Sequence, residues 1–135
     1  MARKYFTLEE ANEILPEVSK ELARIKQIKE EFNELYQQLQ MHHKTLQYRH
    51  KTRADADIMF KKETQMEFME IEVKTYIRNI VSKGVEIKAI DQGLLDFPAQ
   101  KDGEEIMLCW KEGEEEINYY HGTDEGFAGR KPITE

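Results

Sequence analysis

The sequence predicts an α+β protein with a short N-terminal helix, a long antiparallel helical hairpin and a small C-terminal antiparallel β-meander. Apolar residues recur three and four positions apart up to a polar break near Thr52, and a second run with the same period follows it. After Gly84 the period changes to two, which is typical of strands. We therefore expect a single domain over residues 1–135, with the hairpin in 1–84 and the meander and tail in 85–135.

The N-terminal helix is expected to begin at a capping box. Thr7-Leu8-Glu9-Glu10 places a hydroxyl and a carboxylate three residues apart, so that each can bond the backbone amide of the other. Pro16 then interrupts the helical pattern. Two alternatives follow: a short helix before a long one that has Pro16 at its first position, or one kinked helix. We favour the break, because the residue before a proline is biased away from helical geometry.

The hairpin is predicted from two apolar stripes. The first consists of Leu8, Ala11, Leu15, Val18, Leu22, Ile25, Phe32, Tyr36 and Leu39, and the second of Met59, Met66, Met69, Val73, Tyr76 and Ile80. The long helix is expected from Pro16 to about His50, the turn within Lys51–Ala54, and the second helix from about Asp55 to Lys83. Two stripes of this spacing around a short break are typical of antiparallel helices.

The hairpin carries more apolar residues than two helices can bury between them. Those off the stripes are Ile14, Ile28 and Leu35 in the first helix and Ile58, Phe68, Ile71 and Ile77 in the second. Each such side chain is worth about 1.5–3 kcal/mol when fully buried. We therefore expect two hairpins to pair as a four-helix bundle, which makes a homodimer the predicted assembly; another protein partner is an alternative.

Short β-type runs follow the hairpin. They begin near Val85, Leu94, Ile106 and Ile117, and turn chemistry separates them at Asp91-Gln92-Gly93, Lys101-Asp102-Gly103 and Glu112-Gly113. This spacing predicts an antiparallel meander of three or four strands. The tail from Gly122 to Glu135 is expected to have no regular structure.

Composition narrows the class of protein. The net charge is −7, and residues 85–135 hold 13 acids against 5 bases, so nucleic acid is an unlikely partner. Cys109 is the one cysteine, which excludes an internal disulfide and fits a reducing compartment. The N-terminus opens polar and no apolar run approaches the roughly 18 residues of a membrane span. We expect a cytoplasmic protein without membrane segments.

Several segments resemble a known family. They are Phe6-Thr7-Leu8-Glu9-Glu10-Ala11-Asn12 with Leu15-Pro16, Gly84-Val85-Glu86-Ile87-Lys88, Gly93-Leu94-Leu95-Asp96-Phe97-Pro98, Leu108-Cys109-Trp110-Lys111-Glu112-Gly113-Glu114, and His121 with Gly126-Phe127-Ala128-Gly129-Arg130. They resemble a bacterial family of uncharacterised proteins, domain of unknown function 2203, sometimes labelled a division initiation protein. Tyr119-Tyr120 departs from the tryptophan expected beside the histidine, but an aromatic is kept. The resemblance implies a prokaryotic cytoplasmic protein and no established activity.

Polar residues of the family-like segment are the candidates for chemistry. A histidine with carboxylates could act as acid and base or bind a divalent metal. The candidate catalytic residues are His121, Asp96, Asp91 and Arg130, and the candidate metal ligands are His121 and Asp124, with Glu125 nearby. The spacing matches no metal signature, and turn formation with an ion pair from Arg130 to a carboxylate is the simpler explanation. No cofactor is indicated, and Cys109 is expected to be a buried, inert thiol.

The hairpin tip is a second candidate. Its residues 36–53 contain no acid, and its cations are Lys44, Arg49, Lys51 and Arg53. His43 and His50 continue the apolar stripe, so with Glu63 they could coordinate a metal, although a polar end to the seam is more usual. The tip could instead contact phosphate or an acidic protein.

The function predicted first is a non-enzymatic oligomeric interaction or scaffold protein. It rests on the extent of the helical seam and on the lack of a recognised catalytic signature. The alternative is a small metal-dependent or acid/base enzyme centred on His121 and nearby carboxylates.

Overall fold

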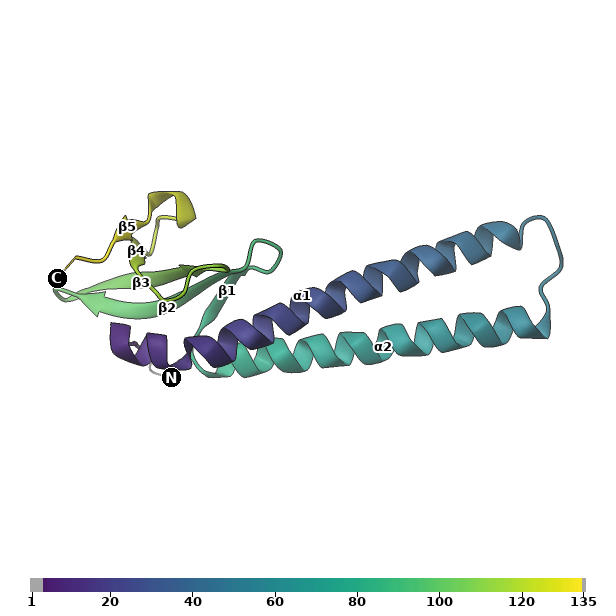
Figure 1. Cartoon of the computed structure of the whole chain (residues 1–135), viewed down its shortest axis with the longest axis horizontal. Helices are drawn as coiled ribbons and strands as arrows, with labels where there is room; N and C mark the ends of the chain where they lie inside the picture. The colour runs from purple at the N-terminus through teal and green to yellow at the C-terminus, as the bar shows by residue number, and fades with distance from the viewer. Residues whose placement is uncertain (1–3, 135) are drawn as a thin grey trace.

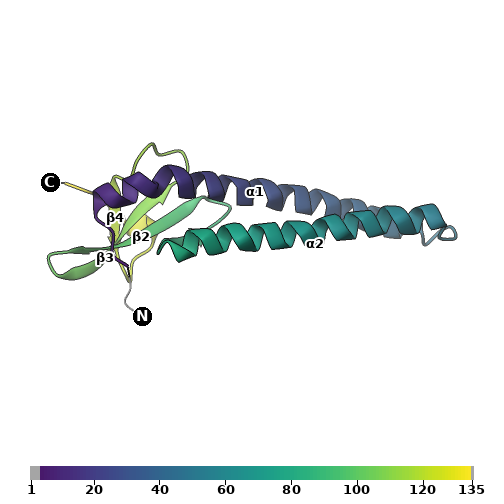
Figure 2. The ribbon, with the colours of Figure 1, turned by 90° about the horizontal axis from the view of Figure 1, so that it is seen from below.

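A computed structural model describes residues 4–134 and confirms the α+β class. The helices are α1 (Leu8–Thr45) and α2 (Arg53–Ser82), and the strands are β1 (Glu86–Ala89), β2 (Leu94–Lys101), β3 (Glu104–Lys111), β4 (Tyr119–Gly122) and β5 (Lys131–Pro132), with a 3₁₀ helix, η1 (Phe127–Gly129), before β5. Figure 1 shows the helical hairpin projecting from the sheet. Figure 2 shows α1 and α2 side by side along their length.

The expected break at Pro16 is wrong. Thr7 and Glu10 form the predicted capping box, but α1 then continues for 38 residues with Pro16 inside it. Proline removes one backbone hydrogen bond and costs about 3 kcal/mol in a helix interior. Leu15 and Val18 are buried on either side of Pro16, and burial of two such side chains at about 1.5–3 kcal/mol each offsets that cost. Tertiary packing therefore keeps the helix continuous.

The first stripe is correct in its N-terminal half and only in part in its C-terminal half. Leu15, Val18, Leu22 and Ile25 are all buried. Beyond them Ile28, which lies off the predicted stripe, is buried and Tyr36 on the stripe is 51% exposed, whereas Leu39 is buried as predicted. A helix of 3.6 residues per turn drifts relative to a seven-residue repeat, so single positions such as Ile28 can replace a stripe position in the seam.

The helix ends at the tip also differ from the prediction. α1 ends at Thr45 rather than near His50, and α2 begins at Arg53 rather than at Asp55. Thr52 and Asp55 form a second capping box that starts α2. Asp55 thus lies within the first turn of α2 instead of opening it. At the other end α2 stops at Ser82, as expected within one residue.

The sheet has five antiparallel strands in the order β1-β2-β3-β4-β5, one more than the expected maximum. The β2–β3 hairpin turns at Asp102 and Gly103, both at positive φ (52° and 80°), as its tight turn requires. The tail is irregular only in part, because it contains η1 and the edge strand β5, which pairs with β4.

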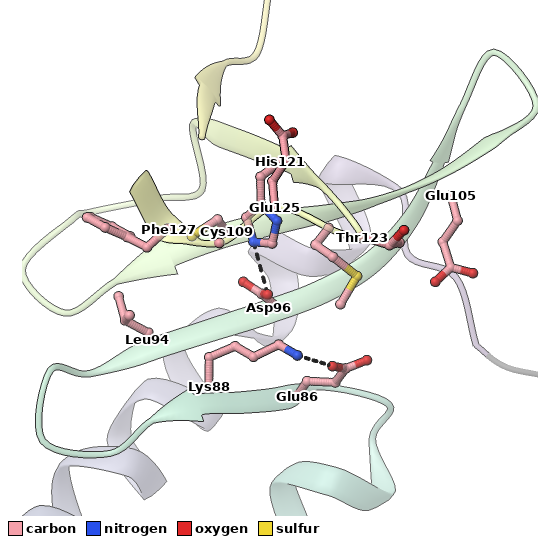
Figure 3. A pocket seen from close by; sticks show the side chains of 12 residues that line it. Glu86, Lys88, Leu94, Asp96, Glu105, Cys109, His121, Thr123, Glu125 and Phe127 are labelled. Atoms are coloured by element: carbon pink, nitrogen blue, oxygen red, sulfur yellow. Dashed lines mark hydrogen bonds and ion pairs between the residues drawn. The ribbon is translucent and has the colours of Figure 1, made fainter. Parts of the chain in front are cut away.

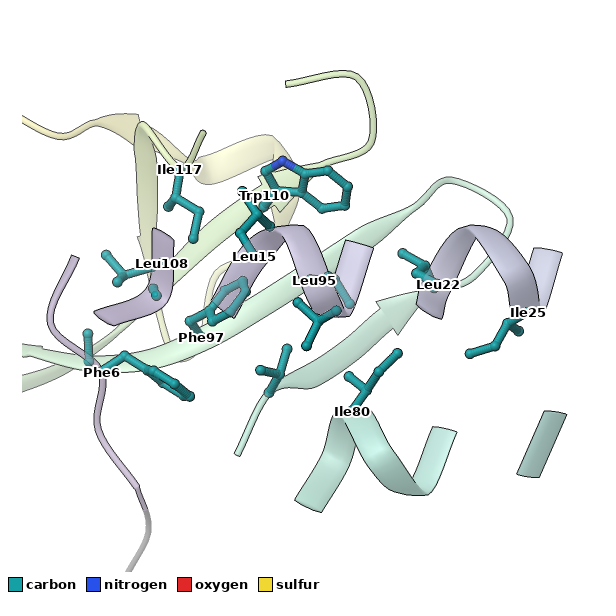
Figure 4. Close-up of a cluster of buried hydrophobic side chains, with 14 residues drawn as sticks. Phe6, Leu15, Leu22, Ile25, Ile80, Leu95, Phe97, Leu108, Trp110 and Ile117 are labelled. Atoms are coloured by element: carbon teal, nitrogen blue, oxygen red, sulfur yellow. The ribbon is translucent and has the colours of Figure 1, made fainter. Parts of the chain in front are cut away.

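The hydrophobic core joins the start of α1, the end of α2 and one face of the sheet (Figure 4). Sheet residues that face the helices include Leu95, Phe97, Leu108 and Trp110, all buried. Side chains alternate between the faces of a strand, so the residues between these point to the opposite face. None of the helices in the described part of the chain is long and apolar enough to cross a membrane.

Candidate functional site

A cavity of about 360 Å³ lies on the sheet face opposite the helices (Figure 3). Its walls are formed by Glu86, Lys88, Leu94, Asp96, Glu105, Met107, Cys109, His121, Thr123, Glu125, Gly126 and Phe127. Strands β1 to β4 supply its floor, and the segment that follows β4 supplies the rest. The charged residues of this wall are mostly acidic, with four carboxylates against one lysine.

Strand register brings Asp96, Cys109 and His121 together at the floor of the cavity. Asp96 of β2 pairs directly with Cys109 of β3. His121 of β4 pairs with Met107, two residues from Cys109 and on the same face of β3. All three are buried, with exposed fractions of 1% for Asp96 and Cys109 and 4% for His121.

The imidazole of His121 lies between two acceptors. Its Nε2 is 3.0 Å from Asp96 Oδ2 and its Nδ1 is 2.8 Å from the backbone oxygen of Gly122. A neutral imidazole has one N–H, and the Gly122 carbonyl can only accept. The arrangement therefore needs a proton or another cation between Nε2 and the carboxylate.

A turn after β4 fixes the Gly122 carbonyl. The backbone N–H of Glu125 donates to that oxygen at 3.0 Å, and the Gly122 N–H donates to Glu125 Oε1 at 2.8 Å. The carbonyl that orients His121 is therefore held by a local turn. The role of Glu125 in this site is to close the turn as well as to line the cavity.

Burial dominates the electrostatics of the other two side chains. Desolvation raises the pKa of the Asp96 carboxyl above its usual value, and His121 opposes the rise. Desolvation also raises the pKa of the Cys109 thiol to about 11, with the charge of Asp96 adding to it. Without a bound cation the thiol is protonated at neutral pH. Cys109 is buried, as predicted, but it lies in a polar cluster.

Ion pairs and hydrogen bonds order the rim. Lys88 Nζ lies 2.7 Å from Glu86 Oε1 on β1, and the Tyr5 hydroxyl donates to Glu105 Oε2 at 2.8 Å. The rim is thus polar and predominantly acidic, which favours the entry of cations.

The remaining sequence candidates lie outside this cavity wall. Asp91 is exposed in the β1–β2 turn, where it pairs with Lys29 of α1 at 3.0 Å. Asp124 is exposed and does not line the cavity. Arg130 makes the predicted ion pair, with Glu114 at 2.8 Å.

Arg130 is also stacked between two aromatic rings. Its guanidinium carbon lies 4.1 Å from the ring centroid of Tyr119 and 4.2 Å from that of Phe127. Beside the cluster, its charge opposes the rise in the pKa of Cys109. Arg130 therefore secures the segment after β4, and its side chain also interacts with Cys109 in the cavity floor.

The histidines of the hairpin tip do not form the metal site that the sequence suggested for His43, His50 and Glu63. His43 and His50 are exposed, so the expectation that they face the partner helix is wrong. His42 faces inward instead, with Nε2 2.8 Å from Asp55 Oδ1, and Arg49 binds the same carboxylate. Among residues 4–134, the only group of three potential metal-ligating side chains is Asp96, Cys109 and His121.

Sequence reasoning found Asp96 and His121 but missed Cys109 as their neighbour. A usable signal was present in the two-residue turn Asp102-Gly103. In a hairpin, a residue a given number of positions before the turn pairs with the residue the same number of positions after it. Counting outward from Asp102-Gly103 in this way places Asp96 opposite Cys109.

A second surface lies on the hairpin. Large apolar side chains of α2 remain exposed at Ile58, Phe60, Phe68, Ile71 and Val81. Phe60 and Phe68 line a groove of about 480 Å³ between α1 and α2, together with Arg24, Glu31, Lys61, Thr64, Gln65, Met69 and Glu72. The hairpin therefore leaves part of its apolar surface uncovered within one chain.

Comparison with known proteins assigns a family. Residues 4–133 match the family described as Uncharacterized conserved protein (DUF2203). No curated protein and no solved structure matches the chain. Because the match spans nearly the whole chain, the chain belongs to the DUF2203 family of uncharacterised conserved proteins.

Proposed function

We propose that the protein is a non-enzymatic, self-associating interaction protein whose hairpin pairs with the hairpin of a second copy. The observation that carries the proposal is the exposure of Phe60, Phe68 and Ile71, at 69%, 71% and 62%. At about 100° per residue these positions fall within an arc of about 80° on α2. One helix face thus presents three large apolar side chains to water, and such a face supports association with a partner.

The charges of the groove suit a copy of the same surface. Arg24 and Lys61 lie along it with Glu31 and Glu72, so cations and acids are balanced in a chain whose net charge is −7. In a two-fold contact the same patch meets itself, so each patch must carry both signs of charge. Arg24 and Glu72 already pair within one chain, at 3.4 Å.

The hairpin is also large enough for such a contact. The 30 residues of α2 extend for about 45 Å, and two adjacent helices present a face about 20 Å wide. The resulting area, about 900 Å², matches the roughly 800 Å² per partner of a standard interface. The proposed assembly is a homodimeric four-helix bundle with coiled-coil packing, in the cytoplasm of a bacterial cell.

Light scattering during size-exclusion chromatography tests the proposal. The wild-type chain is expected at twice its monomer mass, and Phe60→Lys and Phe68→Lys are expected to shift it towards the monomer. Tyr48→Lys is the matched control, because Tyr48 is 87% exposed at the tip and lies outside the groove. A wild-type chain that is monomeric at every concentration would refute the proposal.

A second candidate function is acid–base chemistry in the cavity. It is favoured by the buried hydrogen bond between Asp96 and His121, which faces a space large enough for a small molecule. Screening chromogenic ester and phosphate substrates with the wild type and His121→Gln tests it. Turnover must fall in His121→Gln and persist in Asp91→Asn, whose site lies in the exposed turn; equal turnover in all three chains would exclude this function.

A further inference from the structure

We infer that Asp96, Cys109 and His121 bind one divalent transition-metal ion of the Zn²⁺ type, with a fourth coordination position open to the cavity. One potential ligand atom from each residue lies within 4.8 Å of the other two. Figure 3 shows the labelled side chains approaching one another from three adjacent strands. This inference concerns the sheet and is independent of the proposed pairing of the hairpins.

The geometry needs little change to accept the ion. With metal–ligand distances of about 2.0–2.3 Å, the donors of a tetrahedral site lie about 3.3–3.6 Å apart. Asp96 Oδ2 and His121 Nε2 are already 3.0 Å apart. Small side-chain rotations, with the strands in place, would bring all three donors to coordination distance.

The orientation of His121 is that of a metal ligand. In such histidines one ring nitrogen binds the metal while the other donates its N–H to a carbonyl or carboxylate. Nδ1 faces the Gly122 oxygen at 2.8 Å and leaves Nε2 directed at Asp96 and the cluster. With its N–H on Nδ1, the ring presents an unprotonated Nε2 to the Asp96 carboxylate, so two acceptors face each other without a proton between them. A metal cation at this point can accept an electron pair from both the nitrogen and the carboxylate.

The chemistry of the donors selects the kind of metal. A thiolate, an imidazole and a carboxylate together suit Zn²⁺ or Co²⁺, whereas Mg²⁺ and Ca²⁺ require oxygen ligands. The acidic wall, with Glu86 and Glu125, favours cation entry. Three protein ligands beside an open cavity leave a position for water, as in sites where the metal contacts a small ligand.

Cobalt spectroscopy of the untagged, chelator-stripped full chain tests the inference. Co²⁺ is expected to bind one per chain, with a thiolate-to-cobalt charge-transfer absorption and the ligand-field spectrum of a tetrahedral site. Zn²⁺ should displace it, and Mg²⁺ in excess should not. If saturating Co²⁺ produces no charge-transfer absorption in the wild type, the inference is wrong, whatever the variants do.

Variants then locate the ion. Cys109→Ser should abolish the charge-transfer absorption, and His121→Gln should weaken affinity at least about tenfold, since even loss of an outer partner of a ligand costs 10–100-fold. His43→Gln is the matched control, because His43 is exposed on α1, and should bind as the wild type does. Circular dichroism checks the fold, and Cys109→Ala replaces Cys109→Ser if that variant does not fold. Unchanged binding in both Cys109 and His121 variants would overturn the site.

Discussion

Asp96 Oδ2 and His121 Nε2 lie 3.0 Å apart in the floor of the cavity, although 25 positions separate the two residues in the chain. Both side chains are almost completely buried. Two polar groups removed from water in this way depend on each other, because neither can recover its lost hydration elsewhere. The contact therefore ties β2 to β4 across β3.

Removing either member of this pair should be costly, and removing both should cost less than the sum of the two separate losses. In the metal-stripped protein, Asp96→Leu or His121→Leu leaves an unpaired polar group and should lower the free energy of unfolding by about 3–5 kcal/mol. The double variant should lose less than the sum of the two losses. Urea unfolding of the four chains measures the coupling. Additive losses would show that the two side chains do not stabilise each other.

Acid should loosen the hairpin tip through Asp55. Hydrogen bonds from Arg49, from the Thr52 backbone and from His42 hold the pKa of the Asp55 carboxyl well below its usual value of 3.8. A depressed folded-state pKa means that the unfolded chain binds the proton more readily. The stabilisation is therefore present above about pH 4, and it is lost as the pH falls below that value towards the folded pKa.

Thermal unfolding between pH 2 and pH 7 measures this effect. Asp55→Asn should lower the melting temperature at pH 7 and should flatten its dependence on pH in the acid range. Asp57→Asn is the matched control, because Asp57 is exposed in the same turn of α2. A wild type and an Asp55→Asn variant with parallel pH profiles would show that the tip network does not contribute.

Replacing Pro16 should stabilise the protein. Pro16 is exposed inside α1 and lacks the N–H that would bond the backbone oxygen four residues earlier. Pro16→Ala restores this bond and should raise the free energy of unfolding by about 1–3 kcal/mol. Lys20→Ala, one turn on and also exposed, should change it by less than about 0.5 kcal/mol. A loss of stability in Pro16→Ala would mean that α1 needs the proline geometry.

Pro16 also shows why part of the fold could be predicted from the sequence and part could not. The capping box at Thr7 and the turn at Asp102-Gly103 depend on neighbours within a few positions, and both were predicted correctly. Pro16 obeys a local rule too, but packing of α1 on the sheet and on α2 overrides it. β5 was missed because it has two residues, which become a strand only through pairing with Tyr119 and Tyr120.

The candidate site, too, could be predicted only in part from the sequence. His121 and Asp96 were candidates because their residue types carry chemistry, and the structure brings them together. Asp91 and Asp124 share that chemistry, but they lie in exposed positions away from the cluster. Cys109 was judged by its sequence neighbours, whereas its relevant neighbours are on β2 and β4. Residue type alone predicts candidates, and strand register decides which of them meet.

Gly93 and Gly103 offer a direct measure of how the β1–β2 turn packs on the end of β3. Both have positive φ, at 70° and 80°, so alanine is strained at either position by about 1–2 kcal/mol. A Cβ on Gly93 would lie 2.5 Å from Cβ of Glu112, whereas a Cβ on Gly103 meets nothing within 4 Å. The Glu112 N–H donates to the Gly93 oxygen at 2.8 Å, so the two segments cannot separate without losing that bond.

Gly93→Ala should therefore cost more than Gly103→Ala, by about 1–3 kcal/mol in the free energy of unfolding. The backbone strain is shared by the two variants, so their difference isolates the steric contact with Glu112. Urea unfolding of both variants measures this difference. Equal losses would mean that the β1–β2 turn moves away from Glu112 without cost. In that case the hydrogen bond between Gly93 and Glu112 would not fix the turn in which Asp91 pairs with Lys29.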